Sequence, residues 1–233
     1  MPYRLGLVAV CFTVLLFPAQ YPRAPILVEL FTSEGCSSCP PADRLLEQMD
    51  PRVIVLSEHV DYWNQQGWAD PFSSAELTAR QEAYSRRFHL DGPYTPQMVI
   101  DGAVEFNGSD ASRASRELTA EAKAPKTPVR LARTDRGIQV TIEGGHTGAG
   151  VFLALADDSG ESNVGAGENR GRKLHHVAIV RSLRKIGKLE RGGGFQREIG
   201  LPEKTRGQRA IVFVQEGETG PVSGVAVLPS EKL

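Results

Sequence analysis

Two kinds of hydrophobic pattern divide the chain. Residues 25 to about 124 mix short continuous apolar runs with segments that carry apolar residues on one helical face. Continuous runs predict buried strands, whereas the periodicity of an α-helix predicts helices. The predicted strands are Ile26–Phe31, Arg52–Val60, Gln97–Ile100 and Ala103–Phe106, the last two joined by an Asp-Gly hairpin turn. The predicted helices are 40–49, 74–88 and 110–122.

The rest of the chain, residues 127–233, is rich in glycine and has almost no helical periodicity. Its short apolar or alternating runs predict strands at Val129–Arg133, Ile138–Ile142, Val151–Ala156, Leu174–Arg181, Lys185–Leu189, Phe195–Ile199, Arg209–Gln215 and Val222–Leu228. Short strands between glycine-rich turns are typical of a β-sandwich. Two prolines and several charges at 121–128 favour a linker. We therefore predict an α/β domain over 25–124 and an all-β sandwich-like domain over 125–233, α+β overall.

The first 24 residues have the pattern of a secretory signal peptide. Arg4 gives a short positive region, an apolar stretch runs from Leu5 to Phe17, and Pro18-Ala19 ends it. The stretch is too short and too poorly flanked for a stable membrane span. The alternative is a buried N-terminal strand or helix. Cleavage predicts a periplasmic or secreted protein that has lost Cys11.

Charge and cysteine content narrow the function classes. The chain has 27 Lys and Arg against 28 Asp and Glu, a formal net charge of −1. This balance does not suggest nucleic acid or an anionic membrane surface as a partner. Three cysteines are too few for a scaffold built from disulfides. Without Cys11, a single pair remains, Cys36 and Cys39.

Cys36 and Cys39 lie three positions apart, after an apolar run and before a predicted helix. A redox-active dithiol occupies this position in a thioredoxin-like domain. The helix N-terminus favours negative charge, so we expect it to lower the pKa of Cys36. Cys39 would then resolve a mixed disulfide. The alternative is a structural disulfide.

Thr95-Pro96 precedes a predicted strand and occupies the place of the cis proline that faces the dithiol in thioredoxins. The order strand, C-x-x-C, helix, strand, helix, Thr-Pro, strand, hairpin, strand, helix resembles the thioredoxin plan. An X–Pro bond is the common route to a cis peptide. We expect Thr95 and Pro96 to line a substrate groove, the alternative being an ordinary proline at a strand start. An aromatic loop and helical insertion at about 61–90 lengthens this plan.

The aromatic loop supplies candidate walls for a cleft near the dithiol. His59 ends the second strand, and Asp61, Tyr62, Trp63 and Trp68 follow it. The alternative is that these side chains simply pack the loop against the sheet.

A soft-metal site is the other chemical alternative for the cysteines. Cys36, Cys39 and His59 could hold copper(I) or zinc. The chain has no second C-x-x-C and no His-rich tract, which disfavours a four-ligand structural zinc. His175 and His176 fall on opposite faces of a predicted strand, so they cannot both point into one site. We expect them to be structural.

Five motifs together resemble the DUF1223 family, secreted thioredoxin-like bacterial proteins without an assigned function. They are VELFTSEGCSSCPPAD at 28–43, HVDYW at 59–63, GWADPF at 67–72, YTPQ at 94–97 and GENRGR at 167–172. The resemblance runs over nearly the whole mature chain. It implies a thioredoxin-like domain followed by a β-rich domain, and it implies no substrate.

Three departures from ordinary thioredoxins surround the cysteines. Gly35 stands where thioredoxins carry a tryptophan. Glu34 places a carboxylate that we expect to oppose a thiolate, and no basic residue lies beside Cys36 in sequence.

Together these features predict thiol–disulfide exchange on another protein, with Cys36 attacking or attacked and Cys39 resolving. No organic cofactor is expected; copper or zinc belongs to the metal alternative. The expected partners are a protein thiol or disulfide substrate and a redox partner. Two alternatives stay open: a soft-metal carrier that uses the same thiols, and a non-catalytic interaction module in which the disulfide stiffens the fold.

Overall fold

The computed structural model describes residues 25–49, 53–202, 205 and 207–233. The predicted signal peptide at 1–24, with Cys11, lies outside these residues. Across the described ranges, no helix is long and apolar enough to cross a membrane.

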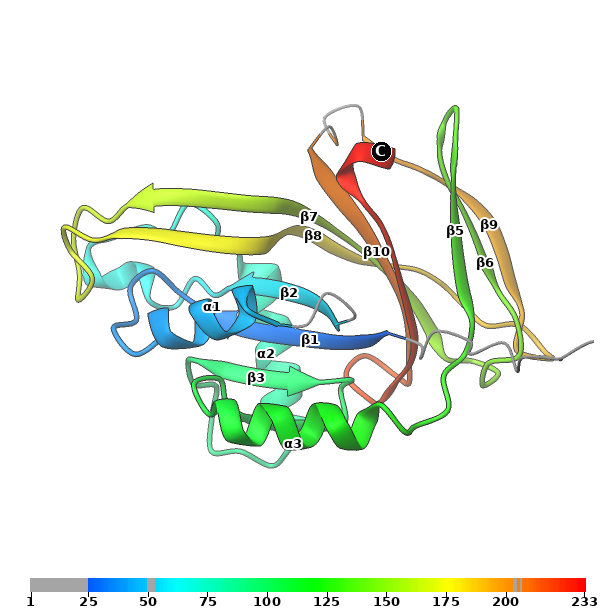
Figure 1. Cartoon of the computed structure of the whole chain (residues 1–233), viewed down its shortest axis with the longest axis horizontal. Coiled ribbons are helices and arrows are strands. Elements are labelled where there is room, and N and C mark those ends of the chain that lie inside the picture. The colour runs from blue at the N-terminus through cyan, green and yellow to red at the C-terminus, as the bar shows by residue number, and fades with distance from the viewer. Residues whose placement is uncertain (1–24, 50–52, 203–204, 206) are drawn as a thin grey trace, which may run out of the picture.

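The first half of the chain folds into strands and helices close to those predicted (Figure 1). They are β1 (Ile26–Thr32), α1 (Pro40–Glu47), β2 (Val53–His59), η1 (Asn64–Gln66), α2 (Ala75–Arg87), β3 (Gln97–Ile100), β4 (Val104–Asn107) and α3 (Ala111–Glu121). Local chemistry sets where the helices begin. Pro40 opens α1, where its missing N–H costs little. The side chains of Ser74 and Asp110 accept hydrogen bonds from backbone N–H groups in the first turns of α2 and α3.

The second half consists of strands and a short final 3-10 turn. They are β5 (Val129–Thr134), β6 (Gly137–Ile142), β7 (Gly150–Asn163), β8 (Lys173–Lys188), β9 (Phe195–Gly200), β10 (Gln208–Gln215), β11 (Val222–Leu228) and η2 (Ser230–Lys232). β7 is longer than predicted, and β8 joins two runs that were predicted as separate strands. The added part of β7, residues 157–163, is polar and pairs with β8. Backbone pairing of this kind leaves no hydrophobic signal in the sequence.

One mixed sheet of eight strands connects the two halves, in the order β11-β10-β7-β8-β2-β1-β3-β4. β1 is parallel to β2 and antiparallel to β3, which is antiparallel to β4. β8 lies parallel to β2, with Ser57 opposite Ile179. Four strands of the second half therefore continue the sheet of the first, across the linker predicted at 121–128. That 25–124 and 125–233 are separate domains stays a prediction.

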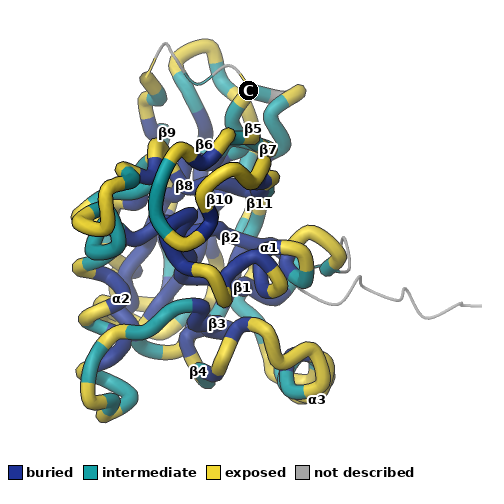
Figure 2. Tube along the Cα trace, turned by 90° about the vertical axis from the view of Figure 1, so that its left-hand side faces the viewer, coloured by how far each residue is buried: buried dark blue, intermediate teal, exposed yellow. Residues whose placement is uncertain are grey.

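Helices cover both faces of the first-half strands. Successive residues of a strand point to opposite faces. Leu30 of β1 therefore packs with Leu46 of α1 and Ala114 of α3, while Leu27 packs with Leu77 of α2. Figure 2 shows β1, β2 and β3 buried in the middle, with exposed residues gathered on helices and loops.

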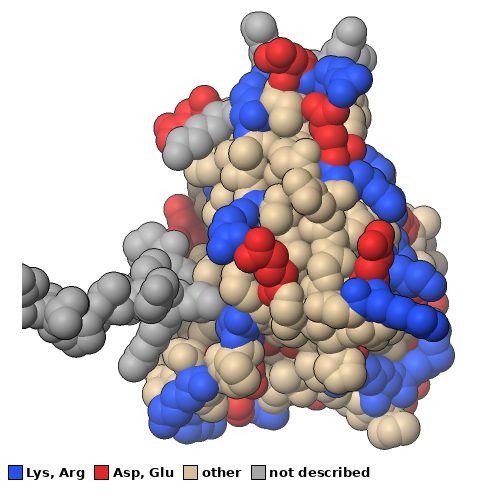
Figure 3. Space-filling model, turned by 90° about the vertical axis from the view of Figure 1, so that its right-hand side faces the viewer, with Lys and Arg blue, Asp and Glu red and all other residues tan. Residues whose placement is uncertain are grey.

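The remaining strands form a three-stranded antiparallel sheet, β5-β6-β9, which packs over the second-half part of the large sheet. Ile138 of β6 shares a core cluster with Leu153 of β7 and Val212 of β10. On the face at this end of the molecule, acidic and basic groups are interspersed (Figure 3). Exposed pairs such as Arg130–Glu143, 3.0 Å apart, contribute little stability. Among the described residues of this face, neither sign of charge forms a continuous patch (Figure 3).

Candidate functional site

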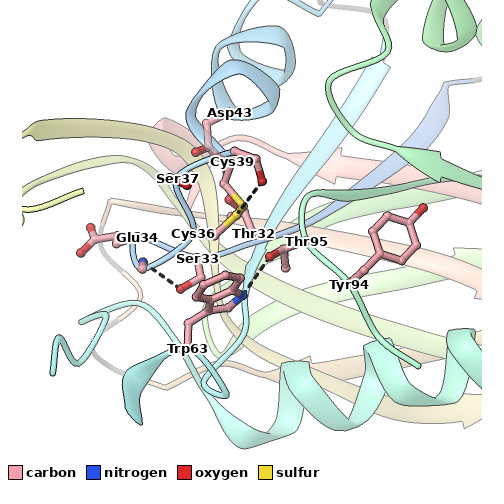
Figure 4. The surroundings of a disulfide bond; sticks show 12 residues. Thr32, Ser33, Glu34, Cys36, Ser37, Cys39, Asp43, Trp63, Tyr94 and Thr95 are labelled. Atoms are coloured by element: carbon pink, nitrogen blue, oxygen red, sulfur yellow. Dashed lines mark hydrogen bonds between the residues drawn. A yellow bond between two sulfur atoms is a disulfide. The ribbon is translucent and has the colours of Figure 1, made fainter. Parts of the chain in front are cut away.

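Cys36 and Cys39 form a disulfide in the turn between β1 and α1, with Cα atoms 5.5 Å apart (Figure 4). The N–H of Cys39 donates to the carbonyl of Cys36 at 3.2 Å. The carbonyl of Cys39 accepts the N–H of Ala42 at 2.8 Å, so the second cysteine already belongs to the start of the helix. The C-x-x-C disulfide predicted at this junction is confirmed.

The turn exposes its serines and buries its cysteines. Ser37 and Ser38 are exposed, whereas Cys36 and Cys39 have no exposed surface. Ser38 Oγ lies 3.4 Å from Cys36 Sγ. A thiolate can attack a disulfide only by reaching one of its sulfurs. Some of the contacts around this turn must therefore open before any exchange.

A loop from the second half of the chain holds the C-x-x-C turn. This β7–β8 loop, residues 164–172, places Asn169 in a fully buried position. Asn169 Nδ2 donates to the carbonyl oxygens of Glu34 and Cys36, each at 2.9 Å. Arg172 Nη1 donates to Asn169 Oδ1 at 2.7 Å and so orients the amide.

Glu168 of the same loop contacts the turn between the two cysteines. Its Oε2 accepts the backbone N–H of Ser37 at 3.1 Å. Hydrogen bonding to the side chain of Ser37, and then to its backbone N–H, lowers the pKa of the Glu168 carboxyl below its usual value. We did not predict Glu168 or Asn169 as site residues. The available signal was the GENRGR motif, which we used only to support the family resemblance.

Thr95 and Pro96 are joined by a cis peptide bond, as predicted. Thr95 Oγ1 accepts a hydrogen bond from Trp63 Nε1 at 2.9 Å, and Figure 4 places Thr95 among the side chains around the disulfide. The carbonyl of Pro96 accepts the N–H of Gly108 at 2.9 Å, which ties the segment to the end of β4. The structure thus brings Thr95 to the cysteines, and its role in a substrate groove stays a prediction.

Trp63 explains the glycine before the first cysteine. A Cβ atom at Gly35 would lie 3.0 Å from Trp63 Cβ, closer than such atoms normally approach. A larger residue at 35 would therefore have to displace Trp63. The site does hold a tryptophan beside the turn, but the aromatic loop supplies it.

Glu34 does not direct its carboxylate at the disulfide, contrary to our expectation. Trp68 Nε1 donates to Glu34 Oε2 at 2.7 Å, and Ser162 of β7 hydrogen-bonds to Oε1. Figure 4 shows the carboxylate pointing away from the two sulfurs. Trp68 therefore belongs to the surroundings of the site through Glu34.

The other two aromatic-loop candidates hold the loop in place. Asp61 Oδ1 accepts the hydroxyl of Thr78 at 2.6 Å, which fastens the loop to α2. Tyr62 packs near Trp63, with ring centroids 6.4 Å apart, against a small core that includes Phe31. The contacts of Asp61 and Tyr62 are thus those of the alternative interpretation, in which these side chains pack the loop against the rest of the protein.

Five ionisable side chains form a buried group beneath the turn, which we call the site cluster: Glu34, Asp43, His59, Asp70 and His176. His59 Nδ1 lies 2.7 Å from Asp70 Oδ2. His176 Nε2 lies 3.6 Å from Glu34 Oε1, and its Nδ1 lies 3.8 Å from Asp43 Oδ2. The two imidazole rings meet edge to face, with centroids 4.5 Å apart.

The site cluster contains polar atoms without hydrogen bonds. Both ring nitrogens of His176 and Nε2 of His59 are buried and have no hydrogen-bond partner. As predicted, the two strand histidines face apart, since the side chain of His175 is 40% exposed and that of His176 is 1% exposed. His176 nevertheless lies at the site, which its isolated position in the sequence did not indicate.

Burial and neighbouring charges shift the pKa values of three cluster members. Burial raises the pKa of the Asp43 carboxyl, although His176 and His59 oppose this. Burial would lower the pKa of His59, but Asp70 outweighs it and the pKa is raised. The same pair lowers the pKa of Asp70 despite its burial. Among the described residues, no three His, Cys, Asp or Glu side chains are grouped so that they could hold a metal ion.

Comparison with known proteins gives one family and two related structures. The family model "Protein of unknown function (DUF1223)" matches residues 27–215. No curated protein matches the chain. Protein AGR_C_4864 from Agrobacterium tumefaciens has a crystal structure that is 28% identical, with a TM-score of 0.79, covering 89% of this chain and 95% of that one. HBP35 of Porphyromonas gingivalis is 14% identical, with a TM-score of 0.58 over 90% of this chain and 76% of that one, a similarity of fold alone.

Proposed function

The chain belongs to the DUF1223 family, and on that premise we propose that it is a periplasmic or secreted thiol–disulfide exchange protein acting on a protein substrate. The observation that carries the proposal is the disulfide between Cys36 and Cys39, in the turn that leads from a central strand into α1. A C-x-x-C pair at such a junction is typical of thiol chemistry. The signal-like pattern of residues 1–24 supports the compartment.

For the first half we propose a thioredoxin-like fold. The strand order β2-β1-β3-β4, with β1 parallel to β2 and antiparallel to β3, supports it. The position of Thr95 beside the disulfide supports it as well. For the second half, the packing of the three-stranded sheet over β7 and β10 supports a sandwich-like arrangement.

In the proposed reaction a substrate thiolate attacks Sγ of Cys36. The bond between the two cysteine sulfurs breaks, its electron pair goes to Sγ of Cys39, and that sulfur takes up a proton. The substrate is then joined to Cys36 by a mixed disulfide. In the opposite direction the Cys39 thiolate attacks Cys36 Sγ and releases the substrate thiolate. The start of α1 favours the negative charge that each step places on a cysteine sulfur.

The proposal is tested by the reduction potential of the purified protein together with its reduction of insulin disulfides. We expect a potential above about −300 mV, the upper limit typical of inert structural disulfides, and measurable insulin reduction. Cys36→Ser should abolish activity. Cys39→Ser should also be inactive and should trap a mixed disulfide through Cys36. A potential below about −300 mV without insulin reduction would contradict the proposal.

A further inference from the structure

We propose that Glu168 and Asn169 are positioning residues of the Cys36–Cys39 pair and set how readily that disulfide is reduced. The proposal deepens the exchange function proposed above and rests on it. Glu168 and Asn169 lie 129 and 130 residues after Cys39 in the sequence. The side chains of Glu168 and Asn169 hydrogen-bond to the C-x-x-C turn. Among the described residues, they make no side-chain hydrogen bond to any other part of the first half.

The β7–β8 loop acts as a clamp on the C-x-x-C turn. The loop closes on itself through hydrogen bonds from Val164 N to Arg172 O at 3.0 Å and from Gly171 N to Val164 O at 2.8 Å. Asn169 projects from it into a fully buried position. Its amide donates to the buried carbonyl oxygens of both Glu34 and Cys36, the second of which also accepts the N–H of Cys39. Losing these hydrogen bonds inside the protein is costly.

The loop also brings a negative charge to the C-x-x-C turn. Glu168 places a carboxylate on the backbone N–H of Ser37, immediately after the reactive cysteine. A thiolate at Cys36 is stabilised by the positive end of α1 and by nearby N–H groups. The Glu168 carboxylate occupies one of these groups and repels the thiolate. Because only the reduced protein contains a thiolate, this repulsion favours the disulfide.

The carboxylate of Glu168 bonds to Ser37, between the two cysteines, whereas Asp70 Oδ2 bonds to the N–H of Glu34, before them. The carboxylate of Glu34, which is nearer in sequence, points away from the sulfurs and is engaged by Trp68 and Ser162. The carboxylate that bonds between the two cysteines thus comes from Glu168, in the second half of the chain.

The test compares Glu168→Gln with Glu161→Gln on the same hairpin. Glutamine keeps an acceptor for the Ser37 N–H but removes the charge. Glu161 lies away from the turn and pairs with Lys173 at 2.6 Å, so it is a matched control. Each protein is equilibrated with reduced and oxidised glutathione, and its thiols are counted by alkylation. We expect Glu168→Gln to shift the equilibrium toward the dithiol by about threefold to tenfold, where tenfold corresponds to about 30 mV. Glu161→Gln should not shift it.

Asn169→Ala tests the clamp. Dithiothreitol supplies two electrons and two protons and converts the Cys36–Cys39 bond into two thiols while it becomes a cyclic disulfide. We expect Asn169→Ala to be reduced at least several-fold faster than the wild type. Circular dichroism of both variants checks that they are folded, and the exposed Glu168→Gln keeps the test valid if Asn169→Ala does not fold.

The outcomes separate this proposal from the proposed function. In one outcome the wild type reduces insulin, and both variants have the same glutathione equilibrium and the same rate of reduction as the wild type. This outcome overturns the positioning role and leaves the exchange function intact. In another outcome the wild type does not reduce insulin, but the glutathione equilibrium of Glu168→Gln is shifted or Asn169→Ala is reduced faster. This outcome supports the positioning role and contradicts the exchange function. A wild type that is inert, with variants identical to it, overturns both.

Discussion

Two buried polar groups, one beneath the disulfide and one beneath α2, differ in how completely their members are bonded. The second, which we call the helix cluster, consists of Glu29, Glu58, Arg80, Tyr84 and Gln215. Its Arg80 guanidinium bonds to Glu29 Oε1 at 2.6 Å and to Gln215 Oε1 and the hydroxyl of Tyr84 at 3.1 Å each. Tyr84 in turn donates to Glu29 Oε2 at 2.6 Å. The site cluster has no comparable centre.

The unpaired atoms of the two clusters also differ in kind. In the helix cluster both carboxyl oxygens of Glu58 lack hydrogen bonds, and burial and the nearby Glu29 raise its pKa well above the usual value. In the site cluster the unpaired atoms are ring nitrogens of His59 and His176. The comparison indicates a structural role for the helix cluster, whereas the cluster next to the disulfide leaves imidazole nitrogens without hydrogen bonds.

Both clusters draw one member from the second half of the chain. Gln215 of β10 completes the helix cluster, and His176 of β8 completes the site cluster. The two halves therefore share buried polar groups as well as a sheet.

Truncation to residues 25–124 gives the largest effect we expect. The fragment lacks Gln215 and His176 and exposes the edge of β2 that pairs with β8, so buried charges lose partners and a strand edge is uncovered. For this fragment we expect no cooperative unfolding transition in urea, followed by circular dichroism. For the protein with both halves we expect one. A fragment with a sharp transition would instead establish 25–124 as an independent domain.

Arg80→Ala gives the next largest effect. It leaves Glu29 buried without its charge partner, and breaking a buried pair in this way costs about 3–5 kcal/mol. Urea unfolding measures the loss in free energy of unfolding. Arg86→Ala on the same helix is the control, since its side chain is 71% exposed and its pair with Glu82 is worth about 0.3–0.5 kcal/mol. Equal losses in the two variants would show that the helix cluster does not act as a structural centre.

His59→Gln gives a smaller effect, seen in the pH dependence of stability. Because the folded-state pKa of His59 is raised, its contribution is fully present below about pH 6.5 and is lost as the pH rises through the raised value. We expect urea midpoints of the wild type to fall over this alkaline range and those of His59→Gln to fall less. The exposed His146 provides the control, His146→Gln, which should keep the wild-type slope. An unchanged slope in His59→Gln would argue against titration of the site cluster.

Local patterns in the sequence were sufficient to predict the strand, the turn and the helix around the disulfide. The apolar run of β1, the C-x-x-C and the proline at the start of α1 are neighbours in sequence, so their geometry follows from the backbone. The cis peptide at Thr95-Pro96 was predictable from its place before β3. The reason for Gly35 was not, because Trp63 contacts it from a loop 28 residues later, from 35 to 63.

The sequence by itself determined where the strands and helices form, where the cysteine pair lies and which family the chain resembles, because these depend on short-range periodicity, turn chemistry and contiguous motifs. Only the tertiary structure decided that β8 lies beside β2, that His176 joins the site cluster and that Asn169 binds the carbonyl of Cys36 from 133 residues away. Such contacts join polar residues that are distant in sequence. They carry no periodic signal, and the packing of the whole sheet brings them together.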